Sequence, residues 1–125
     1  MIDVIADILS TCRKVIPESF YLINDRPSVS YPYAVFYYDG DAREWNQDGF
    51  YIDVDIFDNL GQNQERIEEL TSDLKKYLEH RVAWIDSGLI RYQYNGANTI
   101  DTGSDTLQRR NMRFYITVDW SRDYD

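Results

Sequence analysis

The sequence predicts an α+β domain, in which an antiparallel sheet of about four strands carries two helices packed on one face. Two observations lead to this fold class. Apolar residues recur at helical spacing in two segments and alternate with polar residues in others. The segments follow the order helix, strand, strand, helix, strand, strand, and the strands of each pair are joined directly, as antiparallel neighbours are. The 125 residues suffice for one hydrophobic core, so we expect a single domain over residues 1–125.

The first helix is expected over residues 2–16. Its apolar residues recur at steps of three and four: Ile2, Ile5, Leu9, Cys12 and Ile16. Pro17 ends this helix because proline cannot continue one. The second helix is expected over residues 60–82, with Asn59 as its N-cap residue. Acidic side chains lie in its first half and basic side chains in its second half, which suits the helix dipole.

Four segments have the composition or alternation of strands: residues 33–38, 50–57, 89–94 and 112–120. The last is the clearest, since apolar and polar residues alternate strictly from Met112 to Trp120. Between the third and fourth strands lies a polar stretch, residues 95–106, which has two glycines and no periodicity. Connections this long are often functional or disordered, so we expect a mobile loop over residues 95–108.

The chain is acidic, because 22 Asp and Glu residues against 13 Lys and Arg residues give a formal net charge of −9. Such a protein would repel nucleic-acid phosphates over a broad surface, which argues against nucleic-acid binding. Cys12 is the only cysteine, and its place in a helical apolar pattern favours a small core residue. No apolar run approaches the ~20 residues of a membrane span, and the N-terminal residues lack signal-peptide features, so we expect no membrane partner.

Residues 51–58, YIDVDIFD, raise the question of whether three nearby carboxylates hold a metal ion. In a strand, Asp53 and Asp55 would both point away from the apolar face, roughly 7 Å apart. A small cation would need further ligands there, and the spacing of a calcium-binding loop fails at Phe57 and Asp58. We favour a half-buried strand with an acidic outer face. A metal-dependent hydrolase that uses Asp53, Asp55 and Asp58 remains an alternative.

Other catalytic arrangements have less support. The only histidine, His80, lies near a helix C-terminus among basic residues, where a positive charge is favoured without any catalytic role. No nucleophile-elbow or phosphate-binding loop sequence occurs. One cysteine and one histidine cannot form a zinc site of the usual kind. We therefore expect that the protein is not an enzyme and uses no cofactor or metal.

Charge is unevenly distributed along the chain. From Asp39 to Asp58 there are seven carboxylates against one arginine, whereas three arginines lie together near the last strand. These arginines could simply form a solvated strand end. Alternatively, an acidic surface on one subunit could meet a basic strand end on its neighbour, which favours head-to-tail contacts. The residues expected at such an interface are Arg109, Arg110, Arg113, Asp53, Asp55, Asn95, Gly96, Asp101, Gly103 and Asp105.

Three stretches recur together in one family of proteins. They are the strand that begins with Tyr31-Pro32-Tyr33, the strand Ile52 to Asp58, and the last strand with Arg109, Arg110, Arg113, Phe114 and Ile116. With the helices between them, they resemble the tail terminator, or tail completion, proteins of long-tailed bacteriophages and prophages. The resemblance covers nearly the whole chain as an ordered pattern of segments.

The resemblance implies a structural role at the head-proximal end of a virion tail, with assembly in the host cytoplasm. Such proteins look like small α+β domains that form a homo-oligomeric, often hexameric ring and end polymerisation of the tail tube. The implied partners are further copies of the chain, the tail tube protein and a head-completion (stopper) protein. DNA would pass through the lumen without specific binding, and the loop at residues 95–108 would become ordered on assembly. Another head–tail connector component, a stopper or adaptor, remains an alternative.

Overall fold

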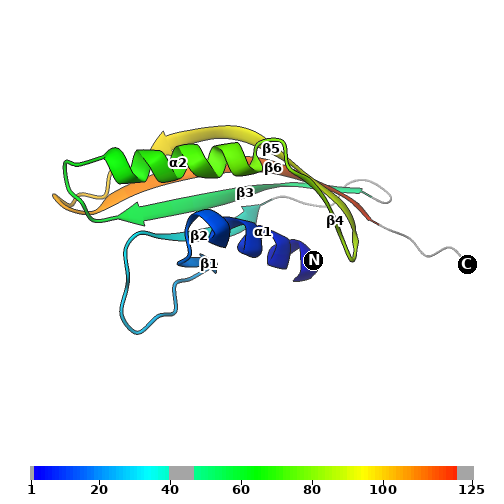
Figure 1. Cartoon of the computed structure of the whole chain (residues 1–125), viewed down its shortest axis with the longest axis horizontal. Coiled ribbons are helices and arrows are strands. Elements are labelled where there is room, and N and C mark those ends of the chain that lie inside the picture. Colours follow the sequence, from blue (N-terminus) through cyan, green and yellow to red (C-terminus); the bar gives the residue numbers. More distant parts are fainter. Residues whose placement is uncertain (1, 40–46, 121–125) are drawn as a thin grey trace, which may run out of the picture.

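A computed structural model describes residues 2–39 and 47–120 of the chain. The elements, in chain order, are α1 (Ile2–Val15), β1 (Ser19–Tyr21), β2 (Tyr33–Asp39), β3 (Gln47–Asp58), α2 (Glu65–Leu78), β4 (Val82–Ile85), β5 (Gly88–Thr99) and β6 (Gln108–Trp120) (Figure 1). Within these residues, six strands form one sheet in the order β1-β2-β3-β6-β5-β4. β1 pairs with β2 in parallel, and all other neighbours are antiparallel.

The expected antiparallel sheet of about four strands is therefore wrong, although the protein is α+β. The sheet is mixed and has two further strands, one at each edge. β1 is not predicted from the sequence because it has three residues and lies in a stretch that is rich in proline and turn-forming residues. β4 escapes notice because Val82 continues the apolar spacing of α2, although the helix ends at Leu78.

The second helix begins later than expected, at Glu65. Its N-cap residue is Gln64, whose side chain makes no capping hydrogen bond, so the expected cap by Asn59 is wrong. The preceding turn is held instead by β6, since Nε2 of Gln108 donates to the backbone oxygen of Gly61 at 2.7 Å. Gly61 has a φ of 62°, a left-handed conformation that residues with a Cβ adopt at a cost.

The hydrophobic core lies between one face of the sheet and both helices. Alternate residues of β3 and β6 are fully buried on this face: Ile52, Val54, Ile56, Met112, Phe114, Ile116 and Val118. The helical segments contribute Val4, Ile8, Cys12, Ile16, Ile67, Leu74 and Leu78. Removing these side chains from water contributes about 25 cal/mol per Å² of apolar surface. Burial also raises the pKa of the Cys12 thiol to about 12, as expected for an inert core residue.

Helix α1 contacts both outer strands of the sheet, β1 and β4. One helix can reach both edges because the sheet curls toward the helices (Figure 1). A partly buried polar cluster joins α1 to the β4–β5 end of the sheet. Asp7 accepts hydrogen bonds from Nη2 of Arg81 at 2.9 Å and from the hydroxyl of Tyr92 at 2.6 Å. Burial, and then the charge of Asp7, raises the pKa of Tyr92, so its hydroxyl stays a neutral donor.

Candidate functional site

The helices leave one face of the sheet uncovered, and we call this surface the open face. Its residues alternate with the core residues along the strands and include Tyr33, Val35, Tyr37, Tyr51, Asp53, Asp55, Phe57, Val82, Trp84, Leu89, Arg91, Gln93, Arg109, Asn111, Arg113, Tyr115, Thr117 and Asp119. Aromatic residues and arginines make up half of these residues. These residue types are enriched at protein interfaces. The open face is therefore the candidate functional surface.

A charged ladder crosses the middle of the open face, between β3 and β6. Its members are Asp53, Asp55, Arg109, Asn111 and Arg113. Asp55 accepts hydrogen bonds from Nη2 of Arg109 and from Nδ2 of Asn111, both at 2.8 Å. Asp53 pairs with Arg113 at 3.3 Å, and Asn111 also reaches Asp53 at 3.3 Å. Asn111 therefore bridges the two carboxylates, and each carboxylate has its own arginine.

Aromatic rings flank this ladder. The guanidinium of Arg113 lies 4.6 Å from the ring centroid of Tyr51, and that of Arg109 lies 5.5 Å from the ring centroid of Phe57. These neighbours leave Asp53 and Asp55 only 7% and 5% exposed, although no helix covers them. Burial, and then the charges of these two aspartates, raises the pKa of Tyr37, so its phenol stays protonated beside them.

The ladder bears on the expected charge complementarity between subunits. The structure confirms that Asp53 and Asp55 share the face opposite the apolar residues of β3. It also pairs them with Arg113 and Arg109 of the same chain. These four side chains are thus already paired within a single subunit. Their proposed role between subunits stays a prediction. Within one subunit, each of these charges is already partly neutralised by its ion-pair partner.

Two other charged residues of the sequence analysis lie on the opposite face, against α2. Asp58 is fully buried and accepts a 2.7 Å hydrogen bond from Nε of Arg66. Burial acts to raise the pKa of Asp58, but hydrogen bonds from Arg66 and from the backbone of Asn59 outweigh it and lower the pKa. Arg110 donates to Glu68 of α2 at 2.9 Å. These pairs join α2 to the ends of β3 and β6.

The separation of the aspartates also bears on the hypothesis of a metal site. Asp53 and Asp55 lie on the open face, whereas Asp58 lies on the helix-covered face, so the three carboxylates do not converge. Among residues 2–39 and 47–120, no group of three or more His, Cys, Asp or Glu side chains is placed to hold a metal ion. A cation would therefore have to displace an arginine from a paired carboxylate.

The loop expected over residues 95–108 is shorter than the sequence indicates. Asn95 and Gly96 belong to β5, at an irregularity in its pairing with β6, where Gly96 has a φ of 110°. Asp101, Gly103 and Asp105 lie in the connection itself. Hydrogen bonds tie this connection together: Asp101 accepts from the backbone of Gly103 at 2.9 Å, and the Thr102 hydroxyl donates to the backbone oxygen of Leu107 at 2.8 Å.

An apolar hollow of about 370 Å³ lies at the β2 side of the open face, and sequence reasoning did not find it. We call it the β2 hollow. Its apolar lining consists of Leu22, Ile23, Val29, Val35, Tyr37 and Phe57. Leu22 and Ile23 are 60% and 68% exposed. The available signal was the presence of Leu22, Ile23 and Val29, together with Phe20, in residues 17–32, a stretch whose turn-forming residues otherwise indicate a loop.

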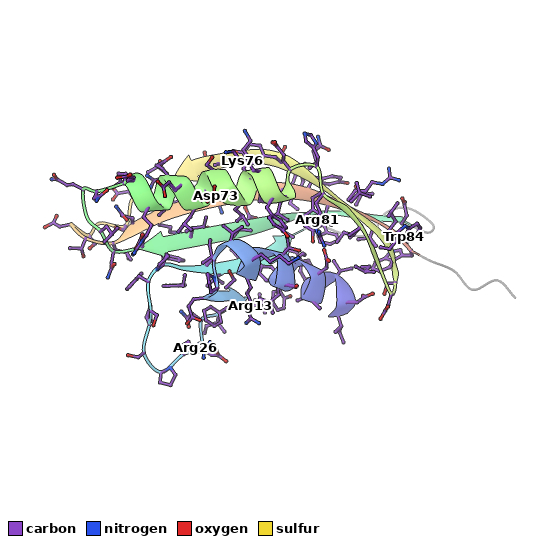
Figure 2. The ribbon with its side chains drawn as sticks, in the orientation of Figure 1. Arg13, Arg26, Asp73, Lys76, Arg81 and Trp84 are labelled. Carbon is purple, nitrogen blue, oxygen red and sulfur yellow. The ribbon has the colours of Figure 1, made fainter. Side chains whose placement is uncertain are left out.

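The opposite edge of the sheet carries Trp84, which is 77% exposed. Trp84 lies in β4 opposite Leu89 of β5, and Val82 of the same strand is 59% exposed. Figure 2 shows Trp84 at one end of the molecule, well separated from the segment that carries Arg26 beside the β2 hollow. The open face thus exposes apolar groups at both of its edges.

No protein-family model and no curated protein matches this sequence. Solved structures do match. A chain from the structure described as "Virion of native gene transfer agent (GTA) particle" has a TM-score of 0.69 and 11% identity, over 86% of this chain and 84% of that chain. The two chains share a fold. A second solved chain has a TM-score of 0.69 and 10% identity, over 97% of this chain and 94% of that chain.

Of the helices in the described residues, none is long and apolar enough to cross a membrane.

Proposed function

We propose that this chain is a structural protein of a phage-like virion and acts there as the tail terminator. In this role, copies of the chain form a ring, with six subunits expected, that caps the head-proximal end of the tail tube. The observation that carries the proposal is the fold shared with a chain of a gene transfer agent virion, over most of both chains. The tail-terminator-like sequence features, at the start of β2 and in β3 and β6, support the finer assignment.

The exposed apolar groups support an assembly role. Monomeric proteins rarely leave large apolar side chains exposed together, and such groups mark sites where proteins dock. Trp84 at one edge of the sheet and the β2 hollow at the other are groups of this kind. A chain with apolar surfaces at two edges can contact two neighbours at once, as a ring requires.

The charged ladder supports a structural role for these side chains rather than a catalytic one. Asp53 and Asp55 are held by arginine and asparagine side chains at hydrogen-bond distance. Carboxylates engaged in this way are poorly placed to bind a cation, because that change would leave a guanidinium without its partner. We therefore propose that the chain is not an enzyme.

The acidic character of the chain fits the proposed position. Further copies, the tail tube protein and a stopper protein are the proposed partners, and DNA would pass through the lumen during packaging or ejection. A formal net charge of −9 repels phosphates, which favours passage without adhesion.

Electron microscopy of tail tubes tests the proposal. The purified chain is mixed with tubes grown from the tube protein encoded in the same genome. We expect rings at one end of each tube and no further growth from that end. A chain that forms no ring and leaves the tubes growing contradicts the proposal. Binding to the portal complex in place of the tube ends would assign the chain to another connector position, that of a stopper or adaptor.

A further inference from the structure

The open face has an apolar projection at its β4 edge and an apolar recess at its β2 edge. We infer that Trp84 of one copy docks into the β2 hollow of the next copy and forms the head-to-tail contact between subunits. The inference rests on the proposed ring and identifies the contact that would close it. β4 is the last strand at one end of the sheet order and β2 lies next to the other end, and Figure 2 shows Trp84 well separated from the segment with Arg26, so the two features of a single chain do not meet.

The dimensions of the two features agree. Trp84 is 77% exposed, so its side chain has few contacts in a single subunit. The β2 hollow is an open recess of about 370 Å³, and pockets that accept small organic groups measure roughly 300–1,000 Å³. Leu22, Ile23 and Phe57 line it with apolar surface. An indole ring that enters such a recess transfers a large apolar surface out of water, which is why tryptophan is common among the residues that dominate interfaces.

The indole also needs a hydrogen-bond acceptor, because its N–H group can only donate and is usually paired when buried. The β2 hollow contains one carboxylate, that of Asp55. Its oxygens accept hydrogen bonds from Arg109 and Asn111, and the Tyr37 hydroxyl also bonds to this carboxylate. A carboxylate can accept about four hydrogen bonds, so Asp55 has capacity for an incoming indole.

The hollow has a second polar group, Asn24, whose side-chain N–H donor lacks an acceptor within the described residues. Nδ2 of Asn24 is buried and donates no hydrogen bond within the described part of the chain. A buried donor without an acceptor is costly, and a docked neighbour could supply one. Among the described strands, β4 pairs with β5 alone and is therefore an edge strand, whose outer backbone carbonyls make no ladder hydrogen bonds. A β4 strand that brings Trp84 into the hollow thus also brings acceptors toward Asn24.

Truncation of Trp84 is the first test. Sedimentation equilibrium gives the dissociation constant for self-association of the wild type and of Trp84→Ala. We expect Trp84→Ala to raise this constant at least about tenfold, as for a central interface residue. The matched control is Ile2→Ala, which shortens another apolar side chain, 87% exposed, on α1. Equal dissociation constants for Trp84→Ala and Ile2→Ala would overturn the inference.

A mixing experiment tests the head-to-tail arrangement. Ile23→Glu places a charge in the hollow but leaves Trp84 intact, whereas Trp84→Ala leaves the hollow intact. Ile23 is 68% exposed, so this variant should fold, which circular dichroism verifies. Each variant alone should be monomeric, and an equimolar mixture should form a 1:1 dimer and nothing larger. A mixture that stays monomeric would overturn the inference.

Tube capping separates this inference from the proposed function. If wild type and Trp84→Ala cap tail tubes equally well, the contact is wrong and the terminator role stands. If the wild type self-associates through Trp84 but leaves tube ends uncapped, the contact stands and the terminator role is wrong.

Discussion

Replacing Arg109 with alanine tests whether the charged ladder stabilises the sheet. Nη2 of Arg109 lies 2.8 Å from Oδ2 of Asp55, whose side chain is 7% exposed. Without Arg109, Asp55 would remain a nearly buried carboxylate. Of its two donors at 2.8 Å, it would keep the neutral Asn111 and lose the charged Arg109. The guanidinium would also leave the ring of Phe57.

The magnitude follows from these contacts. A hydrogen bond to a charged group contributes about 1.5–3 kcal/mol, and removing one partner of a buried ion pair costs about 3–5 kcal/mol. The Arg109 side chain is 35% exposed, so water screens part of the interaction. We therefore expect Arg109→Ala to lower the free energy of unfolding by about 2 kcal/mol, near the lower end of these ranges.

Urea unfolding at pH 7, followed by circular dichroism in dilute protein, measures this change. Arg91→Ala is the matched control. Arg91 lies on the same face and pairs with Asp119 at 3.7 Å, but both side chains are well exposed, at 57% and 41%. Exposed pairs contribute about 0–1 kcal/mol, so this control should lose less than 1 kcal/mol.

The double variant Arg109→Ala/Asp55→Asn completes the cycle. Because the variant carboxamide carries no charge, loss of Arg109 should then cost less than it does in the wild type, by about 1.5 kcal/mol. If Arg109→Ala is no more destabilising than Arg91→Ala, or if the cycle shows no coupling, the ladder does not stabilise the fold as argued.

Three further predictions concern the core and the aspartates. Phe114→Asp should abolish folding, because it places an unpaired charge at a fully buried position; a folded circular dichroism spectrum would contradict this. The lowered pKa of Asp58 stabilises the fold above its unfolded pKa of about 3.9, and this contribution disappears as pH falls through the folded pKa. The difference in unfolding free energy between wild type and Asp58→Asn should therefore shrink below about pH 4, and a constant difference from pH 7 to pH 2 would show that the ion pair is not its source. Calorimetry with magnesium, manganese or calcium should give no binding heat, whereas tight binding abolished by Asp53→Asn would restore the metal hypothesis.

The periodicity of the sequence predicted the core elements well. α1 has its expected start and ends one residue earlier than proposed, and the alternation in β3 places Ile52, Val54 and Ile56 in the core. These features depend on local spacing, which a single sequence displays directly. The edge strands were missed because three or four residues are too few to establish a period, and because Val82 extends the pattern of α2.

The pairing within the ladder could not be read from the sequence. Asp55 and Arg109 are 54 positions apart, and they meet only because β3 pairs with β6 in one particular register. That register depends on how the whole sheet assembles. Without that register, the charge pattern of the sequence allows either a solvated strand end or a contact between acidic and basic groups of different subunits. Trp84 was missed for a related reason, since its exposure becomes evident only when β4 is known to be an edge strand.

The contacts of α1 with both β1 and β4 have a geometric consequence. Because this helix packs against both margins of the sheet, its bulk limits how closely the two margins can approach each other. If subunits join through those margins, the bend of the sheet sets the turn from each subunit to the next, and hence how many are needed to complete a circle. Buried side chains of α1, such as Val4 and Ile8, would then govern stoichiometry without touching any neighbour.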